Sequence, residues 1–493
     1  MPQKETISSN DRIADLKKAL LQNPNDPSLH IQFISNLIGK QNYQEADAPS
    51  QRALKRFPQS TQLILLRAQV LSNLGKFQPA KHLLNALLSK APDTAVAHIL
   101  LGLIDTEQGA DQQAIDHFET AASLMPDDCQ ASFFAASLYL KHLALEDAEK
   151  ALKQTLHVNP DHIGALKCLG DLMINTNRYG EAIAPLQRVF ELSEGDDNSA
   201  ASLVMAQSIS NERKSAVKLG FKFHHQFPNS IVLKEAYALA LIRDGAFEQA
   251  LEVCDSIIHE AQNPTTGIAY KAIALIENGE KDAAMSLLCM DDFATTGMLP
   301  TPTGWADLDT FNDALIAQIM NHQTLADHDS NRSLIHAQDT LELFTGDETG
   351  AIKDLRTTIE AYVAVYMNAL KCKPEHPFRK SQPQKYHLEA WANVYTRTGR
   401  QLSHFHPPAW LSGVYYPKMP LNLGINDTGK REGGLELGSS YYRLDTKNEI
   451  PTTVVEPVAG SIILFPSYVG HNTIPITETD ESRISIAFNI IGA

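Results

Sequence analysis

Near the end of the chain, three histidines and an arginine stand at spacings that could build a metal site. His404 and His406 are two residues apart, and side chains two apart on a strand point to the same face. His471 lies just past a later predicted strand and could close a one-sided metal site with them. Arg483 and Ser485 share one face of the following strand, where a guanidinium and a hydroxyl suit a terminal carboxylate. The spacing therefore predicts a metal centre beside an anion-binding arginine.

Short strands must position these residues. From Tyr386 onward the spacing of apolar residues changes from helical to alternating, which is typical of strands. Two amphipathic helices, Leu308–Met320 and Ala351–Leu370, are predicted before this point. Many short strands with glycine and proline breaks indicate an antiparallel sandwich or jelly roll, and hence an α+β domain. The predicted strands are 391–396, 410–416, 434–437, 452–455, 461–465 and 483–490.

Four ordered blocks of this region resemble the 2-oxoglutarate- and Fe(II)-dependent oxygenases, in particular a bacterial and phage branch. The blocks are His404–Pro407, Ser412–Tyr416, Phe465–Ser467 with the following His471, and Arg483–Asn489. The resemblance implies a double-stranded β-helix (jelly roll) core and a dioxygenase that uses Fe(II), 2-oxoglutarate and O2. It also implies oxidative decarboxylation of 2-oxoglutarate and, most often, hydroxylation of a substrate C–H bond.

Carried over by position, the resemblance makes His404 and His471 iron ligands. His406 stands where the wider superfamily has an acid. His406 is either a third imidazole ligand, which we favour, or it lies next to the ligands without binding the metal, and water completes the coordination of the iron. Glu436 and Asp427 are nearby acids, but neither is at the required strand position.

The resemblance also implies the residues that bind the co-substrate. Arg483 and Ser485 would hold the distal carboxylate of 2-oxoglutarate. Tyr416 and Asn393 are candidates to hydrogen-bond the same molecule, although packing in the barrel explains a tyrosine equally well. No catalytic side chain is predicted beyond these ligands to metal and co-substrate.

The chain up to residue 290 shows an internal repeat with a period of about 34 residues. Alanines recur at this interval without a gap from Ala46 to Ala284, and prolines recur at multiples of it from Pro24 to Pro228. A third series consists of Gly75, Gly109, Gly245 and Gly279, with Leu143, Asn177 and Asn211 in the places between. The pattern predicts a helix, a tight turn, a second helix and a proline break in each repeat.

These repeats resemble the tetratricopeptide repeat (TPR) family, with about eight repeats over residues 11–290. The resemblance implies a helical solenoid whose extended concave surface binds a protein or peptide. A spacer or an oligomerisation scaffold is the alternative role for such an array.

The composition of the chain limits the classes of partner and the cellular compartment that we expect. The chain has 493 residues and a net charge of −16, from 42 basic and 58 acidic residues, which argues against nucleic acid or membrane as a partner. The five cysteines form no C-x-x-C pair, which indicates a reducing compartment. The N-terminus lacks the apolar core of a signal peptide, and no apolar run approaches about 18 residues. We therefore expect a cytoplasmic protein.

The sequence thus predicts four segments. Residues 1–10 are expected to be disordered, 11–290 to form the repeats, 291–304 a linker, and 305–493 the oxygenase-like domain. The predicted function is a 2-oxoglutarate-dependent hydroxylase whose repeats bind or position a protein or peptide. Two alternatives remain: a non-enzymatic repeat scaffold with a degenerate metal-binding jelly roll, and a cupin-type three-histidine dioxygenase acting on a small molecule.

Overall fold

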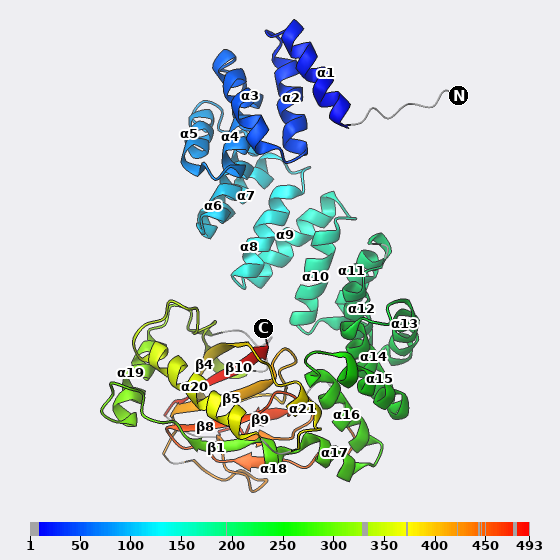
Figure 1. The fold of residues 1–493 in the computed structure, drawn as a ribbon, viewed down its shortest axis with the longest axis vertical. Coiled ribbons are helices and arrows are strands. Elements are labelled where there is room, and N and C mark those ends of the chain that lie inside the picture. Colours follow the sequence, from blue (N-terminus) through cyan, green and yellow to red (C-terminus); the bar gives the residue numbers. More distant parts are fainter. Residues whose placement is uncertain are drawn as a thin grey trace. The chain divides into compact units, whose positions relative to one another are not determined.

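A computed structural model divides the chain into two compact units, Met1–Leu172 and Met173–Ala493 (Figure 1). The residues that the structure describes are 9–193, 195–327, 334–370, 373–421, 423–441, 444, 446–448, 450–476 and 481–492. The predicted disordered N-terminus, residues 1–10, lies outside this range up to residue 8.

Helical hairpins build the first unit, as the repeat pattern predicts. Its helices are α1 (Ser9–Gln22), α2 (Pro27–Gly39), α3 (Tyr43–Arg56), α4 (Thr61–Asn73), α5 (Phe77–Leu88), α6 (Ala95–Glu107), α7 (Asp111–Leu124), α8 (Gln130–Lys141) and α9 (Leu145–Val158). Helix α10 (Ile163–Asn175) contains the boundary between the units.

The second unit begins with further helices of the same kind. They are α11 (Tyr179–Leu192), α12 (Asp197–Ile209), α13 (Arg213–Gln226), α14 (Ile231–Asp244), α15 (Phe247–Glu260), α16 (Thr265–Glu277) and α17 (Lys281–Leu288). The short α18 (Met290–Phe293) follows them.

A left-handed residue forms the tight turn inside each repeat. Positive φ angles between 57° and 87° recur at the repeat interval, at Gln41, Gly75, Gly109, Leu143, Asn177, Asn211, Gly245 and Gly279. A left-handed residue reverses the chain at the end of the first helix, so glycine and asparagine are favoured there. The glycine series of the sequence therefore marks one backbone conformation, including at Leu143, where a side chain makes it costly.

The alanine series marks the closest approach of helices. Every alanine of the series is completely buried: Ala46, Ala80, Ala114, Ala148, Ala182, Ala216, Ala250 and Ala284. A larger side chain at these points would separate the two helices of a repeat. The predicted TPR-like arrangement of helices is confirmed.

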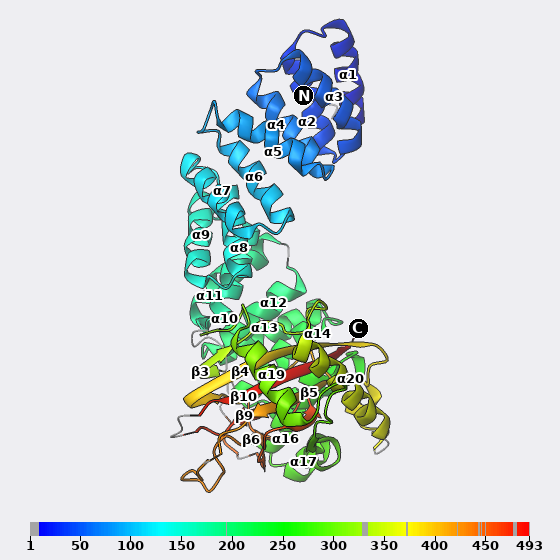
Figure 2. The same cartoon turned by 90° about the vertical axis from the view of Figure 1, so that its left-hand side faces the viewer.

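Two antiparallel sheets form the rest of the second unit (Figures 1 and 2). The larger has the order β1-β8-β5-β10-β4-β3-β2, and the smaller has the order β7-β6-β9. Their bounds are β1 (Thr295–Met298), β2 (Ala326–Asp327), β3 (Leu334–Asp339), β4 (Tyr386–Gln401), β5 (Leu411–Lys418), β6 (Leu435–Leu437), β7 (Thr453–Val455), β8 (Ser461–Pro466), β9 (His471–Thr473) and β10 (Arg483–Gly492). This two-sheet arrangement is consistent with the predicted jelly roll.

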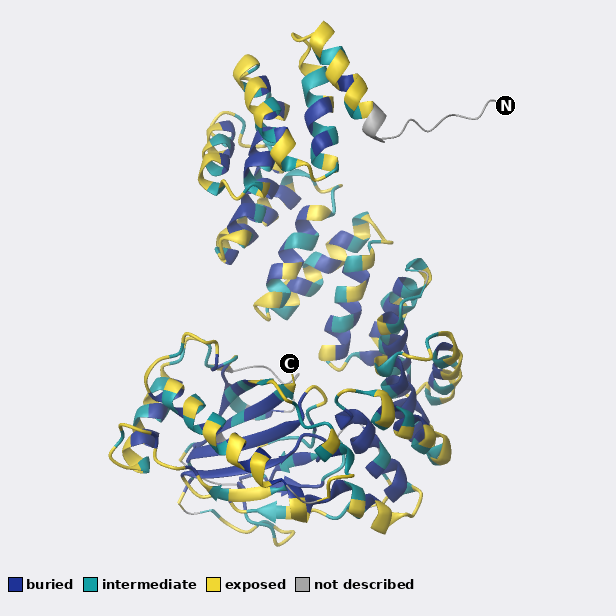
Figure 3. Cartoon of the chain, in the orientation of Figure 1, coloured by how far each residue is buried: buried dark blue, intermediate teal, exposed yellow. Residues whose placement is uncertain are grey.

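Three further helices accompany the sheets: α19 (Leu308–Met320), α20 (Gly350–Ala369) and α21 (Pro377–Lys380). The two long ones lie where the amphipathic patterns predict them. Leu355, Ile359 and Val363 repeat every four residues along α20 and are fully buried in one apolar core with strands β4, β5, β8 and β10. Figure 3 shows the central strands as buried and the outer face of α20 as exposed.

Several elements of the sheets were absent from the sequence prediction. Residues 291–304, predicted as a linker, contain most of α18 and all of β1, and β1 pairs with β8 at one edge of the large sheet. Strands β2, β3 and β9 are also additional. Strands β2 and β9 have only two and three residues, too few to display alternation. The domain boundaries at residues 290 and 304 remain predictions.

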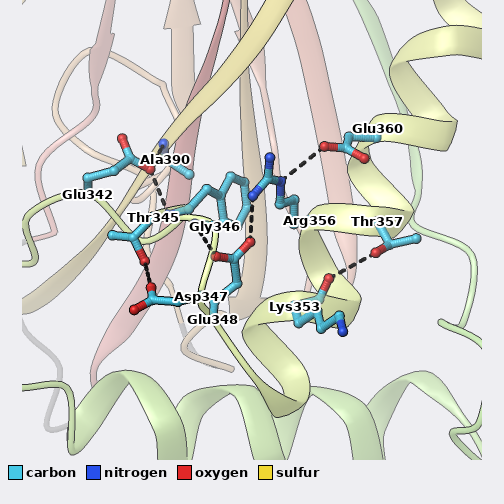
Figure 4. Close-up of polar contacts among 11 residues, drawn as sticks. Glu342, Thr345, Gly346, Asp347, Glu348, Lys353, Arg356, Thr357, Glu360 and Ala390 are labelled. Carbon is cyan, nitrogen blue, oxygen red and sulfur yellow. Dashed lines mark hydrogen bonds and ion pairs between the residues drawn. The ribbon is translucent and has the colours of Figure 1, made fainter.

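The segment before α20 is attached to the sheet by its own acidic side chains (Figure 4). One carboxylate oxygen of Glu342 accepts the backbone N–H groups of Ala390, at 3.0 Å, and Phe344, at 2.7 Å. Arg356 on α20 pairs with Glu348 at 2.7 Å and with Glu360 at 3.0 Å. These contacts join the start of α20 to strand β4.

The last helices of the repeat region and the sheets share one core. Apolar residues of α14 to α16 belong to the same buried cluster as those of β4, β5, β8 and β10. Asn263, just before α16, donates to the carbonyls of Pro407 and Pro408, at 3.2 and 3.0 Å. Thr265 donates to the carbonyl of Ala409 at 2.8 Å. The segment that follows His406 is therefore held by the final repeat.

Candidate metal and co-substrate site

The three predicted histidines meet between the two sheets. His404 and His471 form an isolated antiparallel bridge, with backbone N to O distances of 3.0 and 2.8 Å. Nitrogen atoms of His404, His406 and His471 all lie within 4.8 Å of one another. Backbone pairing of two positions that are distant in the sequence thus builds a compact group of imidazoles.

Hydrogen bonds orient two of the rings. Nδ1 of His404 donates to the carbonyl of Leu402 at 2.8 Å, and Nδ1 of His471 donates to that of Val469 at 3.1 Å. A carbonyl only accepts, so Nδ1 carries the proton and the lone pair is on Nε2. Both rings are therefore arranged as metal ligands through Nε2.

Burial keeps these rings neutral. It lowers the pKa of His404 to about 4, and the nearby backbone carbonyl of Leu402 offsets only part of this effect. Burial and the neighbouring imidazoles lower the pKa of His406 and His471 well below 6.5. A neutral imidazole is the form that binds a metal, so none of the three rings has to lose a positive charge near pH 7.

Two residues that the sequence analysis did not single out contact the histidines. The amide nitrogen of Gln401 lies 3.2 Å from Nε2 of His404, and that of Asn489 lies 3.2 Å from Nδ1 of His406. Nε2 of His406 is 3.3 Å from Nε2 of His471. Asn489 is the last residue of the sequence block Arg483–Asn489, but the sequence alone gives it no role. Only the structure shows that its amide contacts His406.

Arg483 is a buried cation in the same pocket. Its side chain is 2% exposed, and its guanidinium carbon lies 4.8 Å from the ring centre of Tyr395 and 5.2 Å from that of Tyr416. Its hydrogen bond to the hydroxyl of Thr473 is long, at 3.4 Å. Nε of Arg483 has no hydrogen-bond partner among the described residues, and no carboxylate of the described chain pairs with this arginine. Such a charge requires an anion.

The other predicted co-substrate residues line the same pocket. Ser485 and Asn393 are directly paired across β10 and β4, and both are nearly fully buried. Within the described part of the chain, the amide oxygen of Asn393 and the hydroxyl of Tyr416 lack hydrogen-bond partners. Burial raises the pKa of Tyr416, and the charge of Arg483 opposes that rise. A neutral phenol and an amide thus line the same pocket as the guanidinium.

Strand periodicity explains why these residues converge. Arg483, Ser485, Ala487 and Asn489 alternate along β10, so their side chains point to one face of the large sheet. Residues of this face and of the small sheet together line one pocket. Gly413 allows the ring of Phe488 to pack behind it, because a Cβ there would lie 2.2 Å from a carbon of that ring.

Neither acid considered as a substitute ligand takes part. Glu436 is bonded to Lys430 and to the hydroxyl of Thr452, the latter at 2.8 Å. Asp427 is exposed in a turn. Of the histidine, cysteine and acidic side chains that the structure describes, only the three histidines form a group with metal-binding spacing.

The residues present fit both implied groups. Three neutral imidazoles form a nitrogen donor set of the kind that suits iron and other first-row transition metals. A buried guanidinium without a carboxylate partner suits a small dicarboxylate such as 2-oxoglutarate, as do a phenol hydroxyl and an amide oxygen that have no hydrogen-bond partner among the described residues. The positions assigned from sequence thus come together, while their roles as ligands remain proposals.

Comparison with known families supports this organisation. Residues 389–489 match the family described as "Putative 2OG-Fe(II) oxygenase", and residues 37–104 match a tetratricopeptide repeat family. A TPR array therefore precedes an oxygenase-type domain. Within the oxygenase match lie all the residues assigned above to metal and co-substrate. The family match implies Fe(II), 2-oxoglutarate and O2 as its cofactors.

Similarity to individual proteins is remote or partial. The chain is 27% identical over 154 residues to human protein O-mannosyl-transferase TMTC1, which covers 30% of this chain and 18% of that protein. The chain thus spans less than a fifth of that relative. PilF of Pseudomonas aeruginosa is 17% identical, with a TM-score of 0.37, over 42% of this chain and 95% of its own. The TPR protein TTC0263 of Thermus thermophilus is 21% identical, with a TM-score of 0.31, over 37% of this chain and 98% of its own.

No helix in the described part of the chain combines the length and apolarity needed to cross a membrane.

Proposed function

We propose that this protein is a 2-oxoglutarate- and Fe(II)-dependent dioxygenase that hydroxylates a protein or peptide held by its repeats. The observation that carries the proposal is the presence, in one pocket, of convergent imidazoles and a buried arginine without a carboxylate partner. Iron with 2-oxoglutarate and O2, when bound, couples oxidative decarboxylation to succinate and CO2 with insertion of an oxygen atom into a C–H bond.

The chain's own residues would bind and orient these groups. His404 and His471 present Nε2 lone pairs fixed by the carbonyls of Leu402 and Val469. Arg483 would bind a carboxylate of 2-oxoglutarate, with the hydroxyl of Ser485 on the same strand face. The phenol of Tyr416 is a neutral donor beside the guanidinium, and it can hydrogen-bond the same carboxylate.

Burial of the pocket supports this role. Tyr416, Arg483 and Ser485 are all at most 2% exposed, so an anion that binds there leaves water behind. Charge-assisted hydrogen bonds are strongest in such surroundings. The arginine, which is costly to bury alone, thereby becomes a determinant of affinity for a dianion.

The repeats supply the second half of the proposal. TPR arrays present an extended surface suited to peptides and proteins, and this array ends in helices that hold the segment after His406. A substrate bound by the repeats would be presented to an oxidising site in the same chain. A captured candidate should gain one oxygen atom, by mass spectrometry, only when 2-oxoglutarate is supplied.

A binding titration tests the proposed site. Manganese-loaded protein, kept without oxygen, should bind 2-oxoglutarate in a calorimetric titration, and Arg483→Ala should weaken that binding roughly 100-fold, as expected for loss of charged hydrogen bonds. Arg356→Ala is the matched control, because Arg356 pairs with Glu348 on the segment before α20, and it should bind like the parent. Equal affinity in all three proteins would contradict the assignment.

One observation favours a second candidate. A ligand set of three histidines, without an acid, is also that of a cupin-type dioxygenase acting on a small molecule. Such an enzyme has no use for Arg483, and the residue at the place of its usual glutamate, Trp410, is buried with its indole N–H bonded to the carbonyl of Phe378 at 2.8 Å. Metal binding without any affinity for 2-oxoglutarate would favour it, or the non-enzymatic scaffold.

A further inference from the structure

His406 lies in a hydrogen-bond chain that differs from those of the other two histidines. Nδ1 of His404 and of His471 faces a carbonyl, whereas Nδ1 of His406 faces the side-chain amide of Asn489 at 3.2 Å. An amide can either donate through its nitrogen or accept through its oxygen. The protonated nitrogen of His406 is therefore set by the orientation of Asn489.

The series of hydrogen bonds continues from the amide of Asn489 to two buried hydroxyls. Ser412 donates to the amide oxygen of Asn489 at 2.9 Å, and the hydroxyls of Ser412 and Ser467 are 2.8 Å apart. Ser412 and Ser467 are at most 2% exposed, and Asn489 is 6% exposed. The backbone N–H of His406 donates to the carbonyl of Ser467 at 3.1 Å, so the series of hydrogen bonds begins and ends at His406.

In the arrangement seen, the amide nitrogen donates to Nδ1 of His406. The proton of the neutral ring is then on Nε2, and it faces the lone pair of His471 Nε2 at 3.3 Å. A metal bound through Nε2 needs the opposite tautomer, with the proton on Nδ1. That tautomer requires the oxygen of Asn489 to face the ring.

A half-turn of the amide provides this second arrangement without breaking the chain. The oxygen of Asn489 accepts from Nδ1 of His406, its nitrogen donates to Ser412, and Ser412 donates to Ser467. Either hydroxyl of the serine pair can be the donor, so Ser467 donates to Ser412 in the first arrangement and Ser412 donates to Ser467 in the second. The two arrangements therefore stabilise different tautomers of His406.

We propose that Asn489 is a positioning residue whose amide orientation selects the tautomer of His406 and so admits this histidine as a third metal ligand. The inference rests on the proposed function for its metal, but its tautomer test does not. It assigns a role to the last residue of the block Arg483–Asn489 and to the serine pair behind it. An imidazole can then replace the expected acid as a metal ligand, because the hydrogen bond from Asn489 to its other ring nitrogen decides whether Nε2 carries a proton.

Three variants of the full chain test the proposal. Asn489→Asp presents only oxygen to the ring and fixes the proton on Nδ1, whereas Asn489→Leu removes the partner. Ser467→Ala removes the final acceptor of the second arrangement and keeps the first. Asn312→Leu is the matched control, because Asn312 is also a buried amide, bonded to the hydroxyl of Tyr415 away from the histidines.

Two readouts are needed. Titration with Fe(II) under nitrogen should give affinity roughly 10- to 100-fold weaker in Asn489→Leu, a smaller loss in Ser467→Ala, and unchanged or tighter binding in Asn489→Asp and Asn312→Leu. Nitrogen-15 NMR of labelled histidines, without added metal, should show His406 protonated on Nε2 in the parent and on Nδ1 in Asn489→Asp.

The outcomes separate this inference from the proposed function. The role of Asn489 would be overturned by Fe(II) affinity in Asn489→Leu equal to that of the parent. It would also be overturned if Asn489→Asp left the His406 proton on Nε2. A parent protein that binds no Fe(II) would instead contradict the metal site, and the tautomer measurement would still decide whether Asn489 controls the ring.

Discussion

At the residue scale, the pocket is marked by polar atoms that the described protein does not satisfy. Buried donors and acceptors nearly always have partners, because an unpaired one costs about 1–3 kcal/mol. Here Nε of Arg483, the hydroxyl of Tyr416 and the amide oxygen of Asn393 lie unpaired around one space. Their concentration is the physical signal that a polar ligand belongs there.

Removal of one imidazole should eliminate most of the metal affinity. His471 is the most buried of the three histidines, and His471→Ala leaves two imidazoles while it keeps the backbone bridge to His404. We expect Fe(II) affinity to fall at least roughly 100-fold while the far-UV circular dichroism stays unchanged. His225→Ala, on an exposed helix surface, is the control. Parent-like metal stoichiometry in the His471 variant would refute the ligand set.

Sequence spacing was sufficient to find the residues with a chemical motif, but not their supporting partners. His404, His406, His471 and Arg483 could be recognised because their types and intervals are unusual together. Asn489 and Gln401 could not, since an amide has no distinctive spacing and acquires meaning only when strand pairing brings it to a ring nitrogen.

At the scale of single elements, the turn at Leu143 carries a conformational cost. Leu143 holds a left-handed conformation, with φ of 57°, at a place where four other repeats have glycine. We expect Leu143→Gly to stabilise the first unit by about 1 kcal/mol, because it removes the clash of Cβ with the backbone. The measurement is the urea midpoint of unfolding. Leu143→Ala keeps Cβ and should give no such gain; equal gains from both would contradict the explanation.

The attachment of α20 predicts a pH dependence. Burial raises the pKa of Glu342 above its usual 4.5, although its oxygen accepts the N–H groups of Ala390 and Phe344 (Figure 4). The folded state therefore favours the protonated carboxyl; the stability this provides is present below pH 4.5 and is lost as the pH rises through the folded pKa.

Glu342→Gln keeps the acceptor without the charge. Its melting temperature should exceed that of the parent at pH 8, and the difference should vanish as the pH falls towards 4.5. Glu342→Leu, which removes the acceptor, should be less stable at every pH. A difference between parent and Glu342→Gln that does not change with pH would show that the charge of Glu342 is not the cause.

At the scale of the whole molecule, the repeats and the oxygenase-type domain do not separate where the repeat pattern stops. Helices α14 to α16 share one core with the sheets, and Glu277 of α16 accepts the backbone N–H groups of Lys447, at 3.0 Å, and Asn448, at 2.8 Å. The period of the sequence identifies repeats, but not which of them are structurally required by the next domain.

Two truncations distinguish repeats that the oxygenase-type domain needs for folding from repeats that it does not need. A chain that begins at Asn159 keeps α10 onward, and we expect it to fold cooperatively and to bind Fe(II) like the full chain. A chain that begins at Asp291 loses α14 to α17 and exposes the apolar face that they cover, so it should aggregate or bind a hydrophobic dye. Soluble, metal-binding protein from the shorter chain would show that the shared core is dispensable.

The fold was predictable where the sequence is periodic and less so elsewhere. Completely buried alanines and left-handed turns recur at one fixed interval, so each repeat reinforces the same inference. Strands such as β1 and β9 are held by partners distant in the chain, and strands this short cannot display an alternating pattern. Their existence depends on the sheets that they complete.

Oxygen-dependent formation of succinate from 2-oxoglutarate tests the central claim most directly. Protein loaded with Fe(II) under nitrogen and then exposed to oxygen should form succinate, even slowly and without substrate. Arg483→Ala, given the same iron, should form about 100-fold less at limiting 2-oxoglutarate, because the buried guanidinium is its carboxylate partner. Succinate formed equally by both proteins, or none from iron-loaded parent that binds 2-oxoglutarate, would contradict the account.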